Sequence, residues 1–130
     1  PIGHNVKIDC LDNRPSNDTI PSGGTIERKF DKAERLPARV SCSIHPWMSG
    51  WLVIRDTPYT AVTDADGKFE IKNLPAGEWQ FLFYHEKAGY VSKVKIHGKP
   101  EEWKKGITTL TIKPGQQDLG DVVVELDLFK

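Results

Sequence analysis

The stretch PARVSCSIHPWMSGWLVI, residues 37–54, carries two strand patterns on either side of a short loop. Before the loop, apolar and polar residues alternate up to Cys42, which predicts a half-buried strand with Cys42 as its last inward residue. After the loop, the apolar run Trp51–Ile54 predicts a fully buried strand. Pro46 lacks a backbone donor and favours extended geometry in the residue before it, so a tight loop is expected rather than a helix. The loop is therefore expected at one end of a β-sheet.

The loop residues Cys42, His45 and Met48 place a thiolate, an imidazole and a thioether at intervals of three. Sulfur ligands favour Cu(I), imidazole suits copper in general, and a His₂Cys site with a weak axial Met is typical of blue-copper centres. Such a site needs a second histidine. The alternating segment His4–Cys10 predicts another half-buried strand, with His4 at one end of its inward face. Taken alone, His4 is better explained as a partly buried histidine that bonds a backbone carbonyl.

The composition of the 130-residue chain favours an all-β protein. Nine prolines, eleven glycines and many short β-branched or aromatic runs indicate frequent turns between strands. Eighteen basic and eighteen acidic residues leave no net charge, which argues against nucleic acid or an anionic membrane surface as a partner. No apolar run approaches the ~20 residues of a membrane-spanning helix, so no membrane span is expected. Because the chain begins at Pro1 rather than Met, we expect that a longer precursor was processed or truncated.

The second half of the chain contains further strand and turn patterns. Two alternating runs around the Asp64–Gly67 turn predict a β-hairpin, and the aromatic run Glu78–Tyr84 predicts the next strand. Strands at 107–112 and 122–128 are expected to finish the fold. The Asp-x-Asp-Gly pattern is similar to part of a calcium loop, but the terminal Glu of that spacing is missing, so a hairpin turn is preferred.

The order Thr-Asp-x-Asp-Gly-x-Phe-x-Ile-x-x-Leu-Pro-Ala-Gly-x-Trp over residues 63–79, followed by Ala88-Gly89-Tyr90, resembles the carboxypeptidase regulatory-like domain. The resemblance covers residues 57–130 and implies a small transthyretin-like β-sandwich. Domains of this kind are usually structural or adhesive accessories in exported proteins. The resemblance therefore implies a fold and no activity for this half.

The first half shows a second resemblance. His4-Asn5-Val6, followed by Cys42-x-x-His45-Pro46-Trp47-Met48, resembles the ligand-bearing C-terminal half of a cupredoxin, and among cupredoxins it is most similar to the amicyanins. The resemblance covers residues 1–56 and implies a Greek-key β-sandwich that holds one type 1 copper ion. It implies that the equatorial ligands are His4, Cys42 and His45 and that the axial ligand is Met48. It also implies that Asn5 and Pro46 support the loop. A cupredoxin carries several strands before its first histidine ligand, so an N-terminal segment or a neighbouring chain is expected to complete the sandwich.

The cupredoxin resemblance implies a blue-copper protein that carries single electrons by outer-sphere transfer. The edge of His45 would lie at the surface, and Trp47 beside it would dock a transient redox partner. With all coordination positions filled, no enzyme activity is expected. Both resemblances imply export to the periplasm or the cell exterior. The alternative is an extracellular structural or assembly module with a vestigial or non-redox copper site, in which unpaired strand edges recruit a neighbour. Copper storage or delivery would use the same ligands.

The two cysteines allow a competing explanation, a Cys10–Cys42 disulfide in a secreted β domain. Cys10 and His4 lie on one predicted strand and are separated by ~20 Å at about 3.3 Å per residue. Disulfide partners need Cα atoms ~5.5–6 Å apart, so Cys42 cannot adjoin both Cys10 and His4. The four-ligand pattern favours copper, which leaves Cys10 as a buried free thiol or as a link to another segment.

Overall fold

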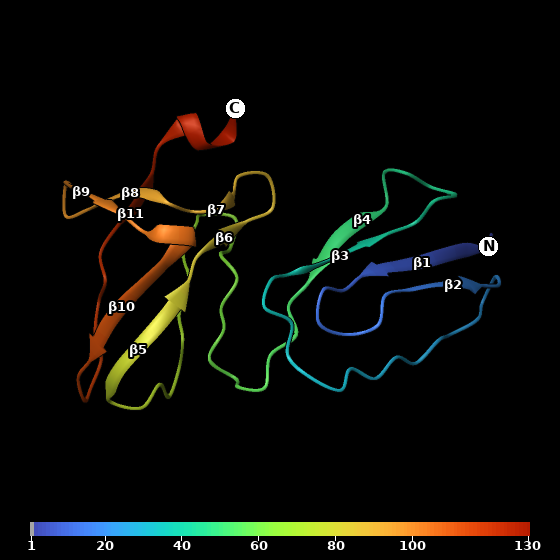
Figure 1. Ribbon diagram of the computed structural model, residues 1–130, viewed down its shortest axis with the longest axis horizontal. Coiled ribbons are helices and arrows are strands. Elements are labelled where there is room, and N and C mark those ends of the chain that lie inside the picture. Colours follow the sequence, from blue (N-terminus) through green and yellow to red (C-terminus); the bar gives the residue numbers. More distant parts are fainter. Residues whose placement is uncertain (1) are drawn as a thin grey trace. The chain divides into compact units, whose positions relative to one another are not determined.

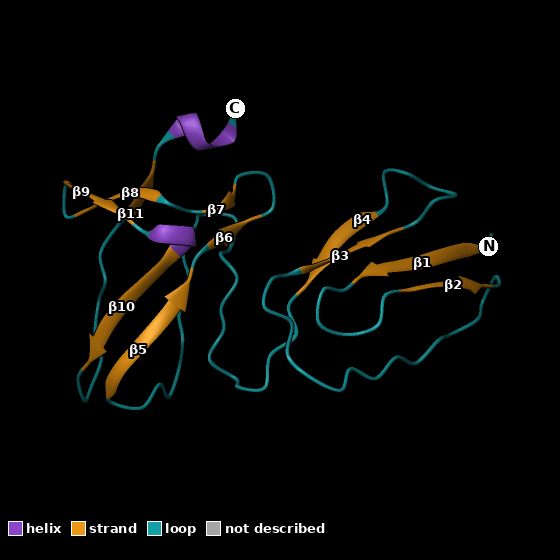
Figure 2. Cartoon of the chain, in the orientation of Figure 1, coloured by secondary structure: helices purple, strands orange, loops and turns teal. Residues whose placement is uncertain are grey.

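The computed structural model describes residues 2–130 and consists of antiparallel β-sheets (Figure 1). The prediction of an all-β fold is confirmed, since strands make up 36% of the structure and no helix among the described residues reaches seven residues. Figure 2 shows the only two helical segments in the described part of the chain, the short 3₁₀ helices η1 (Lys104–Gly106) and η2 (Leu126–Phe129). Among the described residues, no helix is long and apolar enough to pass through a membrane. The chain divides into two compact units, Pro1–Thr60 and Ala61–Lys130.

The first unit is an open four-stranded sheet with the order β2-β1-β3-β4. Its strands are β1 (His4–Asp9), β2 (Ser16–Ile20), β3 (Ala38–Ser41) and β4 (Ser49–Leu52). Strand β1 pairs antiparallel with both β2 and β3, so it lies inside the sheet, while β2 and β4 form the edges. This order brings the N-terminal strand next to the strand that leads into Cys42.

The core of this unit is small and follows the period of two that strands impose. Ile8, Cys10 and Ala38 are buried. Partly buried apolar residues pack against these three, namely Val6, Phe30, Val40 and Ile54. On the opposite face of β1, Lys7 pairs with Asp9 at 2.9 Å in solvent. His4, the first residue of β1, therefore lies at one end of the inward face of this strand.

The prediction of a fully buried strand at 51–54 is wrong. Strand β4 begins earlier, at Ser49, and ends at Leu52. Trp51 and Val53 are 40% and 48% exposed. Because β4 is an edge strand of an open sheet, it is covered on fewer sides than an apolar run inside a sheet would be.

The long connection between β2 and β3 is held by one buried carboxylate. Glu34 is only 1% exposed, although the surrounding sequence is highly charged. Its two carboxylate oxygens accept hydrogen bonds from the consecutive backbone N–H groups of Leu11, Asp12 and Asn13, at 2.6–3.0 Å. The Asn13 Nδ2 group donates a further bond of 2.8 Å. A buried carboxylate is tolerated because donors surround it.

The second unit contains three smaller sheets. Strands β5 (Gly77–Leu82) and β10 (Ile107–Ile112) form one pair, and β6 (Tyr84–His85) and β7 (Gly89–Tyr90) form another. The third sheet has the order β11-β8-β9 and consists of Val122–Val124, Lys93–Ile96 and Lys99–Glu102. The predicted strand at 122–128 stops at Val124, and η2 follows it.

The core of the second unit is aromatic and β-branched. Val91, Val94, Ile96 and Trp103 are buried together, and Phe83 packs on Trp103 with ring centroids 4.7 Å apart. Gly106 lies at the edge of this core with φ +68°, and a Cβ there would be 2.4 Å from the Phe83 carbonyl oxygen. Only glycine fits this position, because both the conformation and the close approach exclude a side chain.

The hairpin predicted around Asp64–Gly67 is only partly present. The turn forms, since the Asp64 N–H donates to the Lys68 carbonyl at 2.9 Å and the Asp64 carboxylate accepts from the Asp66 and Lys68 N–H groups. The described residues between β4 and β5 contain no strand. Asp64 thus serves the turn through its own side chain, as turn aspartates commonly do.

Candidate metal centre

Three side chains that are far apart in the sequence converge in the first unit. His4 opens β1, Cys42 directly follows β3, and His45 lies in the loop between β3 and β4 (Figure 1). The Nδ1 atoms of the two histidines are 3.1 Å apart, and His45 Nδ1 is 3.7 Å from Cys42 Sγ. One ligand atom from each residue lies within 4.8 Å of the others. The three residues therefore form a group that could hold a metal ion.

Two of the three separations between these atoms are close to what a shared ion requires, and the third pair lies within 4.8 Å. Metal–nitrogen bonds of ~2.0–2.1 Å and a metal–sulfur bond of ~2.3 Å, at angles of ~110–120°, place two nitrogens ~3.4–3.6 Å apart and nitrogen and sulfur ~3.6–3.8 Å apart. The observed separations of 3.1 Å and 3.7 Å need only small movements of the imidazoles. Cys42 is buried and both histidines are partly buried, so solvent has limited access to the group. The donor set of one thiol and two imidazoles suits copper or zinc.

Backbone hydrogen bonds close the loop that carries two of the donors. The β3–β4 ladder ends at the Ser41–Ser49 pair, and the Cys42 N–H extends it by donating to the Met48 carbonyl at 3.0 Å. The Met48 N–H in turn donates to the His45 carbonyl at 2.8 Å. The loop is therefore a tight turn, in which the position of His45 relative to Cys42 is fixed by the main chain.

Met48, the predicted axial ligand, is tied to the group through these backbone bonds. Its side chain is 43% exposed. The side chains that converge are those of His4, Cys42 and His45. The role of the Met48 thioether stays a prediction.

The side chain of Asn5 fastens the loop to strand β1. Its Oδ1 accepts hydrogen bonds from the N–H groups of Ser43 at 2.7 Å and Ile44 at 3.3 Å. The Cys42 thiol also donates to this oxygen, at 3.4 Å. Pro46, the other predicted supporting residue, is exposed within the turn. Asn5 thus holds the residues that follow Cys42 beside the strand that carries His4.

The surroundings of Cys42 favour its thiolate more than those of Cys10 do. Burial raises the pKa of the Cys42 thiol, but hydrogen bonds from the backbone of Asn5, from the loop and from His4 outweigh it and lower the pKa from 9.0 to about 7. For Cys10, burial and the nearby Glu34 carboxylate both raise the pKa. Since metals bind the thiolate, Cys42 is the better ligand. Both cysteines are free and buried, so they form no disulfide with each other.

The surface around His45 is apolar and exposed. Trp47, the predicted docking residue, is 77% exposed, and its ring meets the His45 ring edge-on at a centroid distance of 5.3 Å. Ile44 is 56% exposed. Large apolar side chains exposed next to one another are a common feature of interaction sites.

Sequence reasoning missed three residues that shape this unit. Ser43 and Asn17 both bond the Asn5 side chain, at 3.3 Å and 2.7 Å. Glu34 stands in the mixed-charge run 27–35, and such a run is typical of solvated surface, so the sequence indicates no role for it. The sequence signal for Ser43 is its place directly after Cys42, whereas Asn17 and Glu34 act on residues more than ten positions away.

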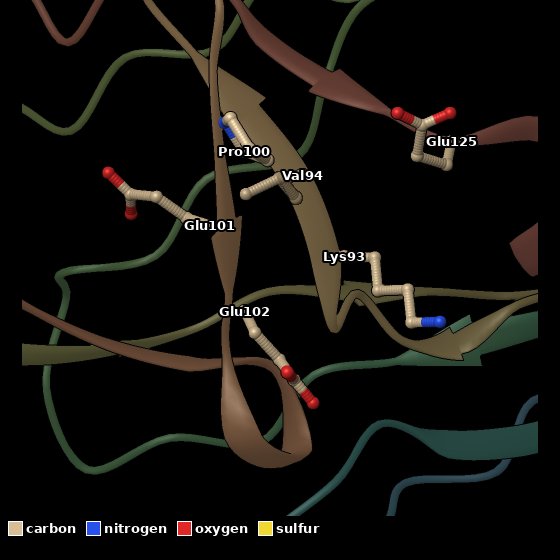
Figure 3. A pocket seen from close by; sticks show the side chains of 6 residues that line it. All are labelled: Lys93, Val94, Pro100, Glu101, Glu102 and Glu125. Carbon is tan, nitrogen blue, oxygen red and sulfur yellow. The ribbon is translucent and has the colours of Figure 1, made fainter.

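A hollow of about 320 Å³ in the second unit is not a comparable site. Figure 3 shows its lining, in which the acidic side chains Glu101, Glu102 and Glu125 point in different directions instead of toward one centre. Glu101 already accepts a bond from Trp103 Nε1 at 2.9 Å, and Glu125 pairs with Lys95 at 2.8 Å. The hollow therefore presents no converging ligands.

Comparisons with protein-family models, with curated proteins and with solved structures give no match to this chain. The residues of the chain establish an all-β protein with a His4-Cys42-His45 group whose geometry suits a metal ion.

Proposed function

We propose that this chain is a type 1 copper protein that carries single electrons by outer-sphere transfer. The observation that supports the proposal most directly is the convergence of His4, at the start of β1, with Cys42 and His45 of the tight loop between β3 and β4. One thiolate and two imidazoles, with the thioether of Met48 in the same loop, form the donor set that favours copper over hard cations. Copper held by this set would supply a one-electron couple.

The chain's own contribution is to hold the donors in place without the metal. The loop is closed by the two backbone hydrogen bonds of Met48, and Asn5 fastens it to β1. A donor set that is fixed in advance needs little rearrangement when its charge changes, which is what electron transfer requires. Cys42, with its pKa lowered to about 7, carries a large thiolate fraction at neutral pH.

The exposed side chains beside His45 support a docking role. Ile44 and Trp47 offer an apolar surface next to the donor group. A small apolar contact suits a partner that binds transiently and leaves after one electron has passed. We further propose that the protein is not an enzyme and that it works in the periplasm or at the cell exterior, in keeping with the exported families that it resembles.

The test is titration of the purified metal-free chain with Cu(II), followed by visible absorption. We expect one equivalent to produce an intense visible thiolate-to-copper band. The Cys42→Ser variant should lack the band, whereas Cys10→Ser, which changes the other buried free thiol, should keep it. His4→Ala should weaken binding, whereas His85→Ala, in the second unit, should not.

Two results would contradict the proposal. One is a folded wild-type chain that takes up no copper. The other is uptake that gives no visible band and that persists in Cys42→Ser, since the thiolate would then not be a ligand. Size-exclusion chromatography adds a further check. A stable copper-loaded monomer favours the carrier, whereas oligomers of the metal-free chain favour an assembly module.

A further inference from the structure

The Asn5 amide bonds the metal loop and also a residue outside it. Its oxygen accepts bonds from Cys42, Ser43 and Ile44. Its Nδ2 group donates to Asn17 Oδ1 at 2.7 Å and to Ser43 Oγ at 3.3 Å. The bond to Asn17 is the shorter of the two by a wide margin, and it leads away from the loop to strand β2.

Asn17 reaches Asn5 diagonally across the β1–β2 ladder. In this ladder Asn5 lies opposite Thr19, and Lys7 lies opposite Asn17. Diagonal neighbours on one face of an antiparallel pair are within reach of polar side chains of this length. The contact therefore joins the edge strand β2 to the residue that fastens the loop. Figure 1 shows β2 alongside β1.

The chemistry of an amide makes this contact directional. If the Asn5 amide were rotated by half a turn, its NH₂ group would face the N–H groups of Ser43 and Ile44, which would place donors against donors. The Ser43 hydroxyl donates or accepts equally well, so it does not select one orientation. In the structure Asn17 turns its Oδ1 toward the Asn5 NH₂ group, and this contact favours the same orientation, with Asn5 Oδ1 toward the loop.

We propose that Asn17 is a positioning residue for the loop that carries Cys42 and His45. It touches none of the three donors and acts through Asn5. Its relevance to metal binding rests on the function proposed above, but its effect on the loop is a property of the metal-free chain. Each of these two claims can therefore fail without the other.

The first test measures amide hydrogen exchange at Ser43 and Ile44 by NMR in the metal-free protein. Loss of one hydrogen bond contributes roughly a two- to tenfold change in an opening equilibrium. We expect Asn17→Leu to speed exchange at these two amides by this factor and to leave the Ile8 and Val40 amides unchanged. Asn17→Asp keeps an acceptor that cannot be rotated into a donor, so it should retain the slow exchange. Thr19→Ala, an exposed change on the same strand, is the matched control.

The second test is a double-mutant cycle with Asn5→Ala, read by the dissociation constant for Cu(II) or Co(II). Asn17→Leu alone should weaken metal binding roughly two- to tenfold. In the Asn5→Ala background the same change should have no further effect, because the connection is already broken. A residue that only stabilised the edge strand would act equally in both backgrounds.

Unchanged exchange at Ser43 and Ile44 in Asn17→Leu would overturn the inference, and so would an equal effect of Thr19→Ala or additivity in the cycle. If wild-type protein binds no metal, the proposed copper function fails. The exchange measurement still decides whether Asn17 positions the loop.

Discussion

The two units of this chain differ in the kind of residue that they bury. The second unit buries Val91, Val94, Ile96 and Trp103, an apolar cluster that needs no hydrogen-bond partners apart from the Trp103 ring N–H. The first unit buries smaller apolar residues and, beside them, the carboxylate of Glu34 and the thiol of Cys42. The second unit is therefore held mainly by packing, and the first depends on hydrogen bonds to a few polar side chains.

This difference explains why the candidate site lies in the first unit. Packing of apolar side chains is non-directional and tolerates many arrangements, whereas hydrogen bonds fix orientation. Asn5 and Glu34 each gather several backbone N–H groups from distant segments. A thiol and two imidazoles can then be held together at the end of a sheet, in a unit with only a small core.

The largest effect is expected from removing the aromatic centre of the second unit. Trp103 is 3% exposed and packs on Phe83, so Trp103→Ala should destabilise this unit by about 3–5 kcal/mol. Urea unfolding followed by NMR signals from each unit measures this loss. Because every donor of the metal group lies in the first unit, copper uptake should survive at low denaturant. Loss of the metal site in this variant would contradict the assignment of packing and site to separate units.

The next effect is a pH dependence of the first unit that comes from Glu34. Burial raises the pKa of this carboxyl, but hydrogen bonds from Asn13, Asp12 and Leu11 outweigh it and lower the pKa from 4.5 to about 2. A carboxylate with a lowered pKa stabilises the fold fully above its unfolded pKa, and this contribution is lost as the pH falls through the folded pKa. The first unit should therefore lose stability between about pH 4.5 and about pH 2.

Glu34→Gln is the control for this pH dependence. It keeps the shape but not the charge, so it should be less stable at pH 7 and should show a flatter profile below about pH 4.5. NMR-monitored unfolding at a series of pH values checks both results. If wild type and Glu34→Gln lose stability in parallel on acidification, another carboxyl is responsible.

A smaller effect is expected from changes at Asn5, which should leave the chain folded but weaken metal binding. Loss of residues that orient ligands typically costs about 10–100-fold in metal affinity. Asn5→Ala should weaken Cu(II) binding by about this factor, because the loop loses the bonds to Ser43 and Ile44. Thr19→Ala, at the position opposite Asn5, is the control. Equal affinities measured by competition with a chelator would show that the loop needs no anchor.

Local patterns in the sequence predicted the strands well where one face is buried. The period of two at 4–10 and 38–42 corresponds to β1 and β3, and the strand predicted at 107–112 is β10. The same reasoning failed at 59–71, because the Asp64 turn is a local feature whereas strands need a pairing partner that the pattern does not specify. It also overextended the last strand, since Leu126 is 79% exposed and lies in a 3₁₀ turn.

For the site, spacing was informative within the loop and less so beyond it. The intervals between Cys42, His45 and Met48 are local, and the tight turn follows from Pro46 and the flanking strands. His4 became a candidate through its place at the end of an inward face together with the cupredoxin resemblance, and its proximity to His45 depends on the β1–β3 pairing. Glu34 and Asn17 act through contacts with residues far along the chain, which no periodicity encodes.

The smallest effect is expected from removing a buried hydroxyl of the first unit that makes no hydrogen bond. Among the described residues, Ser16 Oγ is a buried side-chain oxygen without a hydrogen-bond partner, and Ser16 lies one residue before Asn17 on β2. A buried hydroxyl without a partner is a cost, so Ser16→Ala should leave stability unchanged or raise it by up to about 1 kcal/mol. Thr19→Ala on the same strand corrects for the lower strand preference of alanine. Copper affinity should stay at the wild-type value because Asn17 and Asn5 are intact.

A loss of more than about 1 kcal/mol in Ser16→Ala relative to the Thr19→Ala control would mean that the Ser16 hydroxyl has a partner in solution, such as a bound water. The polar network of the first unit would then extend past Asn17 along β2.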